Sequence, residues 1–276
     1  MSFPASFPPA HRVRWALAAG AASLALAAWL LPPVAQSESY HAFADQRAWG
    51  ALPHAADVLS NAGFLLAALA GAWALARSRA IPLDCTTRAL ATLFFAGLAC
   101  AGVVSAWYHW APHDATLLWD RLGMVPAFAG LLGLAVQTRV DGRCAWAVAL
   151  GVLAAGPWTL AVWAATGNAL PWALLQGGGM LAVLGLACMA PRTEALALRL
   201  GAVIAFYAMA KLLEWGDAAV FAATQGAVSG HSLKHLAAAC AALPVMAALQ
   251  AARQGTIAAS SLPSSRRAST IRQGRA

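Results

Sequence analysis

The sequence predicts an all-α fold, a polytopic membrane helical bundle with a seven-helix core and one additional N-terminal transmembrane helix. Three observations predict it. Of the 276 residues, 61% are hydrophobic and only 10% are charged, against about 25% charged residues in soluble domains. Mean hydropathy is +0.65. The apolar residues also fall into eight runs, each long enough, at about 20 residues, to cross a bilayer as one helix.

The runs divide the chain into three parts. Residues 1–35 hold a short basic N-terminus and an apolar run at 13–31, expected to be a retained helix or, alternatively, a signal peptide. The core is expected at 36–250. Residues 251–276 form a basic tail, which we expect to be disordered and cytoplasmic. The seven expected core spans are residues 56–76, 88–108, 116–136, 144–164, 170–189, 195–215 and 230–249.

Charge predicts the orientation in the membrane. With the N-terminus inside, arginines gather in the cytoplasmic loops and the tail, and eight spans return the C-terminus to the cytoplasm. Juxtamembrane arginine therefore accounts for the net charge of +8 without nucleic-acid binding. The bias toward alanine and arginine suggests a bacterial cytoplasmic membrane. Single cysteines argue against a disulfide framework, and no motif indicates a protein partner.

This topology brings five chemically active side chains to one membrane depth. Ser105 and His109 lie at the outer end of the span at 88–108, and Asp120 lies near the outer start of the next one. His231 and His235 lie at the outer start of the last span. We therefore expect one site on the outer, periplasmic side.

The residue types predict a metal site. His231 and His235 are four residues apart, so a helix presents both on one face. With His109 they make three imidazoles, a ligand set that suits zinc and leaves a fourth position for water. Asp120 is the candidate acid/base group, and Ser105 could stabilise an oxyanion. The set indicates metal-assisted hydrolysis of an amide or ester.

Each residue also has a simpler interpretation. A single His-x3-His pair is a modest signal, and a lone His109 would be an interfacial histidine. The hydroxyl of Ser105 could bond to its own helix, and Asp120 could cap a helix start. We expect the side chains of the two lysines, Lys211 and Lys234, to extend toward water.

The ordered pattern Ser105-x3-His109, Asp120 and His231-x3-His235 resembles the alkaline ceramidase family. That family belongs to a membrane-hydrolase superfamily that includes the progestin and adipoQ receptors. The shorter marks Phe43-Ala-Asp45-Gln-Arg47, Asp57-Val-Leu-Ser60-Asn61 and Trp119-Asp120-Arg121 are similar to its bacterial branch. The resemblance covers residues 40–250.

The resemblance implies a seven-helix bundle with zinc on His109, His231 and His235, Asp120 as acid/base and Ser105 as the stabilising hydroxyl. It implies hydrolysis of the N-acyl amide of ceramide, or of a similar long-chain N-acyl lipid in the bilayer, to a fatty acid and a sphingoid base or amine. It leaves calcium open. The alternative is a non-enzymatic receptor or sensor with a structural metal site.

Overall fold

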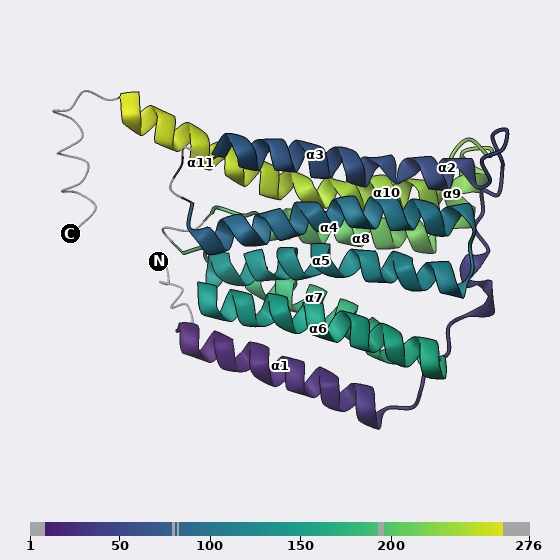
Figure 1. Cartoon of the computed structure of the whole chain (residues 1–276), viewed down its shortest axis with the longest axis horizontal. Helices are drawn as coiled ribbons and strands as arrows, with labels where there is room; N and C mark the ends of the chain where they lie inside the picture. The colour runs from purple at the N-terminus through teal and green to yellow at the C-terminus, as the bar shows by residue number, and fades with distance from the viewer. Residues whose placement is uncertain (1–8, 79–80, 82, 193–195, 262–276) are drawn as a thin grey trace, which may run out of the picture.

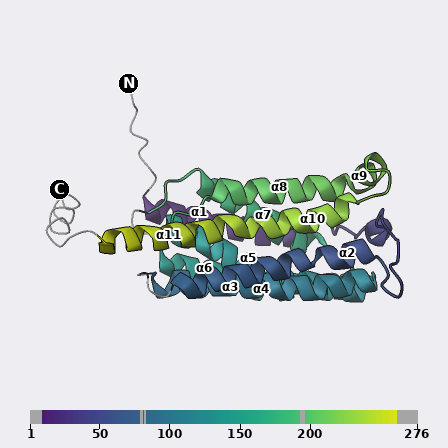
Figure 2. The ribbon, with the colours of Figure 1, turned by 90° about the horizontal axis from the view of Figure 1, so that it is seen from above.

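A computed structural model describes residues 9–78, 81, 83–192 and 196–261. Helices run side by side along one axis, and no β-strand occurs in these ranges (Figures 1 and 2). The all-α prediction is therefore confirmed. The elements are α1 (Ala10–Leu30), the 3-10 helix η1 (Glu38–His41), α2 (Ala55–Ser60), α3 (Ala62–Arg77), α4 (Cys85–Trp110), α5 (Asp114–Arg139), α6 (Gly142–Thr166), α7 (Leu170–Ala187), α8 (Leu200–Trp215), α9 (Asp217–Ala223), α10 (Gly230–Ala239), η3 (Cys240–Ala242) and α11 (Leu243–Ser261).

Seven of the described helical segments are long and apolar enough to cross a membrane, which indicates a multi-pass membrane protein. They correspond to seven of the eight predicted spans, with α2 and α3 forming one of them, and α10, η3 and α11 another. The remaining predicted span is α8, which has 16 residues. It lies alongside the other helices in both views (Figures 1 and 2).

Two predicted boundaries were wrong. The span expected from Ala195 begins as a helix only at Leu200, and Ala195 lies outside the described residues. The intervening Leu196 and Leu198 are buried in a non-helical connection. Their apolar side chains therefore indicate a buried position and not a helical one. At the other end, the last helix continues to Ser261, which makes 251–261 helical instead of disordered. Alanine, glutamine and arginine are good helix formers. The rest of the tail lies outside the described residues.

Glycines allow α4 and α5 to pack with their backbones nearly in contact. A Cβ atom added at Gly97 would lie 2.1 Å from the backbone nitrogen of Ala127, and one at Gly130 would lie 2.4 Å from that of Phe94. Small residues at such crossings give membrane helices their closest packing. The contact matters for function because α4 carries Ser105 and His109, whereas α5 carries Asp120.

The additional helix α1 lies at the edge of the bundle, against α7 (Figure 1). A Cβ added at Gly178 of α7 would lie 2.2 Å from a methyl carbon of Leu24. Val13 is the buried residue of α1, whereas Trp15 and Trp29 are exposed. A helix with so little of its surface inside the protein suits a lipid-facing position.

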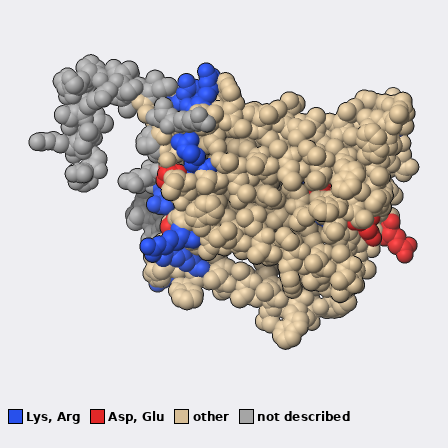
Figure 3. Space-filling view, viewed as in Figure 1, with Lys and Arg blue, Asp and Glu red and all other residues tan. Residues whose placement is uncertain are grey.

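The two ends of the bundle differ in charge. On the face seen in Figure 3, arginine and lysine gather at the end where the described chain starts and stops, and a group of acidic residues lies at the opposite end. His109 is in the last turn of α4 and His231 in the first turn of α10, so both lie at the end opposite the arginine-rich end. That the arginine-rich end faces the cytoplasm stays a prediction.

Candidate metal centre

Helix α10 presents two of the three predicted ligands. The Ser229 hydroxyl caps the helix by accepting a hydrogen bond from the backbone N–H of Ser232 at 3.0 Å. His231 and His235 follow on one face, with 6% and 4% of their surface exposed. Buried imidazoles at this spacing require partners inside the protein, because an unpaired buried polar group is costly.

His109 supplies the third imidazole from α4. Its side chain is 1% exposed and packs against the rings of Phe43 and Tyr108, with centroids 4.8 and 4.7 Å away. The candidate ligand atoms of His109, His231 and His235 all lie within 4.8 Å of one another. Among the described residues, these three form the group of ligating side chains close enough to share an ion. The predicted histidine cluster is thus brought together as expected.

The distance between two of these nitrogens fits a shared ion. Nε2 of His109 lies 3.3 Å from Nε2 of His231. Two nitrogens bound to one tetrahedral zinc at about 2.0–2.1 Å are separated by about 3.3 Å. Nitrogen atoms that face each other at this distance share either a proton or a cation. The third imidazole beside them favours a cation.

A hydrogen bond from α2 sets the orientation of His235. The Ser60 hydroxyl lies 2.8 Å from Nδ1 of His235 and donates its proton to the backbone carbonyl of Asp57 at 2.9 Å. Since a hydroxyl has one proton, Ser60 must accept from the Nδ1–H group of His235. Nε2 of His235 therefore keeps its lone pair for a metal. Such second-shell bonds are usual around histidine ligands.

Asp57 and Asp217, to which the sequence analysis assigned no role, stabilise the start of α10 through hydrogen bonds. Asp57 is fully buried and accepts a hydrogen bond from the Ser232 hydroxyl at 2.6 Å. Asp217 accepts hydrogen bonds from the backbone N–H of His231 at 2.7 Å and of Ala44 at 2.9 Å. Both carboxylates lie at span ends on the same side of the bundle as the histidines, and this position was the signal in the sequence that could have linked them to the site. The hydrogen bonds of Asp57 and Asp217 join residues at least 14 positions apart in the sequence, so local sequence patterns do not predict them.

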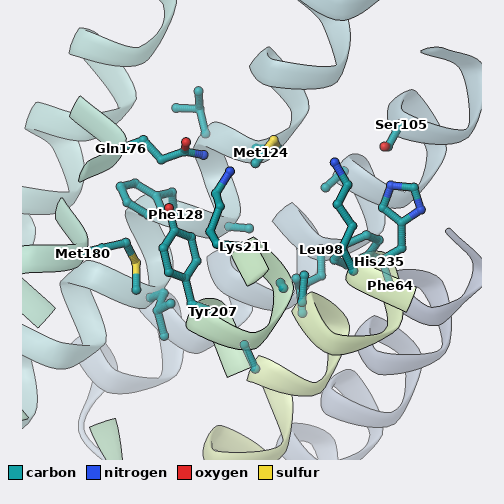
Figure 4. Close-up of a pocket in the computed structure, with 18 of the residues that line it drawn as sticks. Phe64, Leu98, Ser105, Met124, Phe128, Gln176, Met180, Tyr207, Lys211 and His235 are labelled. Carbon is teal, nitrogen blue, oxygen red and sulfur yellow. The ribbon is translucent and has the colours of Figure 1, made fainter. Parts of the chain in front are cut away.

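Ser105 and Asp120 line a cavity beside the histidines, together with His235. Ser105 lies one turn before His109 on α4, and Asp120 is in α5, which packs against α4. The cavity has a volume of about 200 Å³. Its other walls are largely apolar, so Ser105, Asp120 and His235 form a polar end, and the opposite end is mainly apolar, with Gln176 and Tyr207 among its residues (Figure 4). Figure 4 shows Ser105 and His235 at one end, and Phe128 and Met180 at the other.

The two lysines were expected to extend toward water, and the structure gives both of them a partner inside the protein as well. Lys211 and Lys234 both line the cavity, and both bind Glu214, with each Nζ atom 2.6 Å from a different carboxylate oxygen. The Lys234 and Glu214 side chains are 19% and 29% exposed, whereas the Lys211 side chain is 47% exposed. Lysines extend to water when they face lipid. Here Lys234 is largely covered by the protein, Lys211 lines the cavity while staying partly exposed, and both ammonium groups bind the Glu214 carboxylate.

The acidic residues near the N-terminal loop have partners of their own. Asp45 is buried and accepts two hydrogen bonds from the Arg47 guanidinium, at 2.8 and 2.7 Å. The hydrogen bonds from Arg47 hold the pKa of the Asp45 carboxyl below its ordinary value, despite the opposing effect of burial. Asp45 is therefore engaged in an ion pair, and a calcium site in this loop stays untested.

A scan against models of known protein families finds none that matches this chain, and a search of curated proteins finds no relative. The sequence and the geometry therefore carry the functional argument. They give a multi-pass membrane bundle with three buried histidines that could hold a metal ion.

Proposed function

We propose that the chain is a zinc-dependent amidohydrolase of the membrane, like the alkaline ceramidases that it resembles. Its substrate would be a long-chain N-acyl lipid, cleaved to a fatty acid and an amine. One observation carries this proposal: the three-histidine cluster adjoins a cavity with a polar end, formed by Ser105, Asp120 and His235, and a largely apolar remainder. A metal with only a structural role needs no such cavity.

His109, His231 and His235 would hold the zinc, which when bound polarises a carbonyl and activates water. The nitrogens fit it, as the 3.3 Å separation of two Nε2 atoms indicates. The hydrogen bond from His235 to Ser60 leaves the nitrogen facing the cluster free to bind. Burial of all three rings restricts access of bulk water to the site.

Asp120 would transfer the proton. In hydrolysis, water adds its oxygen to the carbonyl carbon, the C–N bond breaks, and one proton of the water must reach the leaving nitrogen. Asp120 lines the cavity and has no basic partner bound to it among the described ion pairs, so its carboxylate is free to accept and return that proton. The Ser105 hydroxyl would donate a hydrogen bond to the carbonyl oxygen as it gains charge.

The apolar walls would bind the acyl chain. Phe128 and Met180 lie at the end of the cavity away from His235 (Figure 4), and Phe94, Leu98 and Leu131 also line it. Burial of each methylene of a chain contributes about 0.8 kcal/mol, so a long acyl group supplies enough binding free energy to hold the amide at the polar end. We also infer that this end faces the periplasm, since arginine and lysine gather at the other end on the face seen in Figure 3.

The test combines metal content with turnover. Purified wild-type protein should contain about one zinc per chain by mass spectrometry, and His231→Ala should contain none. Asp120→Asn should keep the zinc and lose release of fatty acid from N-acyl lipids by a factor of about 10² to 10⁴. Zinc without turnover on any N-acyl lipid would favour the receptor or sensor alternative. A folded wild-type protein without metal would refute both the amidohydrolase proposal and the receptor or sensor alternative.

A further inference from the structure

The cavity holds a cationic cluster that the proposed hydrolysis does not use. Lys211 and Glu214 lie one turn apart on α8, and Lys234 reaches Glu214 from α10. Glu214 offers one oxygen to each ammonium group, at 2.6 Å in both cases. The sequence contains two lysines, and both line this cavity. Arginine supplies the positive charge everywhere else in the chain.

The cluster has more positive than negative charge. Two ammonium groups share one carboxylate, which leaves a formal charge of +1 in a largely apolar cavity of a membrane protein. Charges in such a place are expensive and mark a functional position. Asp120 is the other carboxylate that lines the cavity. Once Asp120 accepts a proton, as the proposed reaction requires, one positive charge of the cluster is uncompensated.

The lysines also lie where a substrate head group would be. Lys234 directly precedes the candidate ligand His235, and Lys211 lies between the polar end and the apolar end of the cavity (Figure 4). A negative group close to the scissile amide would complete the charge balance. A lysine presents a compact ammonium that binds a carboxylate as a point charge. An uncharged diol or alcohol would leave the excess charge in place.

We propose that Lys211 and Lys234 bind a carboxylate borne close to the amide, so that the preferred substrate is a long-chain N-acyl amino acid. This inference rests on the proposed amidohydrolase for the cleavage step, but not for binding. The competing interpretation is that the lysines and Glu214 only fasten α8 to α10. A purely structural role predicts that loss of either lysine lowers the stability of the protein and lowers its affinity for every ligand to the same degree.

The experiment compares two ligands with the same chain, N-palmitoylglycine and N-palmitoylethanolamine, which differ in carboxylate against hydroxyl. Binding is measured by calorimetry on full-length Asp120→Asn protein in detergent, because this variant is expected to bind without turnover and its side chain is uncharged. N-palmitoylglycine should bind at least tenfold more tightly. Added Lys211→Met should abolish that preference while changing the affinity for N-palmitoylethanolamine less than twofold.

Charge-matched variants separate recognition from fastening. Lys211→Arg should keep the preference, whereas Glu214→Gln should increase it, because it removes the internal competitor for the lysines. Fastening predicts instead that Glu214→Gln and Lys211→Met act in the same direction on both ligands. The comparison of the two ligands in the Asp120→Asn protein needs no lysine variant. The inference can therefore be refuted by that comparison even if Lys211→Met misfolds.

The outcomes for the two proposals are distinct. Equal affinity for the two ligands overturns the carboxylate site, even if wild-type protein hydrolyses both amides. Tight, lysine-dependent binding of N-palmitoylglycine supports the carboxylate site, even if wild-type protein with zinc cleaves neither amide. In that case the amidohydrolase proposal is the one that fails.

Discussion

Replacement of Ser60 by alanine tests how the metal centre is organised, because Ser60 touches His235 without being a ligand. The Ser60 hydroxyl accepts from Nδ1–H of His235 at 2.8 Å, so it fixes both the tautomer and the ring orientation. In Ser60→Ala, a buried N–H group loses this acceptor, which costs about 1–3 kcal/mol. At about 1.4 kcal/mol per tenfold change, the dissociation constant for zinc should rise roughly 5- to 140-fold, which spans the roughly 10- to 100-fold typical of second-shell losses.

The assay is competition for zinc against a chelator of known affinity, with purified protein in detergent. Ser78→Ala is the matched control. Ser78 is buried, whereas Ser60 is partly buried, and the Ser78 hydroxyl donates to the carbonyl of Ala74 in the preceding helix at 2.8 Å. Ser78 follows Arg77 at the C-terminal end of α3, at the arginine-rich end of the bundle. This control should bind zinc like the wild type. A folded Ser60→Ala protein with zinc affinity within twofold of the wild type would refute the role of Ser60, as would an equal loss in Ser78→Ala.

Three further predictions concern other parts of the molecule. His235→Ala should lose zinc and turnover together, measured by mass spectrometry and fatty-acid release. Gly97→Val should lower the melting temperature, because its side chain would overlap the backbone of Ala127 and overpacking costs about 1–3 kcal/mol. Arg47→Ala should destabilise the protein at neutral pH but less so below about pH 4. The lowered pKa of Asp45 stabilises the fold above the ordinary carboxyl pKa, and this effect is lost as pH falls through the folded-state pKa.

Each of these has a contrary result. Full zinc and normal turnover in His235→Ala would remove His235 from the site. An unchanged melting temperature in Gly97→Val would contradict the close helix crossing, with Gly151, which has open space at its Cβ position, as the control site for the same substitution. A difference between Arg47→Ala and wild type that stays constant from pH 7 to 3 would contradict the ion pair.

The sequence predicted the helices well because a membrane span must satisfy its backbone hydrogen bonds within itself, and long apolar runs therefore become helices. It predicted ends less well. Leu196 and Leu198 are apolar yet non-helical, since they are buried by packing. The helix after Leu249 continues although its hydropathy falls, because leaving the membrane does not end a helix.

The histidine cluster was predictable because topology alone brings the two segments that carry it to one end of the bundle. His231 and His235 are related by local helix geometry, and His109 joins them through the alternation of spans. The partners of these residues were not predictable in the same way. The contact between Ser60 and His235 spans 175 positions in the sequence and depends on how far each helix is rotated about its axis, which weak amphipathic patterns do not determine.

Rotation also explains why Lys234 is covered by the protein instead of extending to water. A lysine near the end of a span extends to water if its helix turns it toward lipid, and binds within the protein if the helix turns it inward. Lys234 follows the inward-facing His231 by three residues and precedes His235 by one. That spacing was a signal that its helix face points into the bundle.

The position of both lysines has a practical chemical consequence. Apart from the N-terminal amine, every primary amine of this protein lies in one cavity. Reagents that acylate or alkylate amines should therefore report on occupancy of that cavity, and a bound ligand should protect the protein from them. For the same reason, amine-based crosslinking or coupling to a solid support would modify residues that line the cavity.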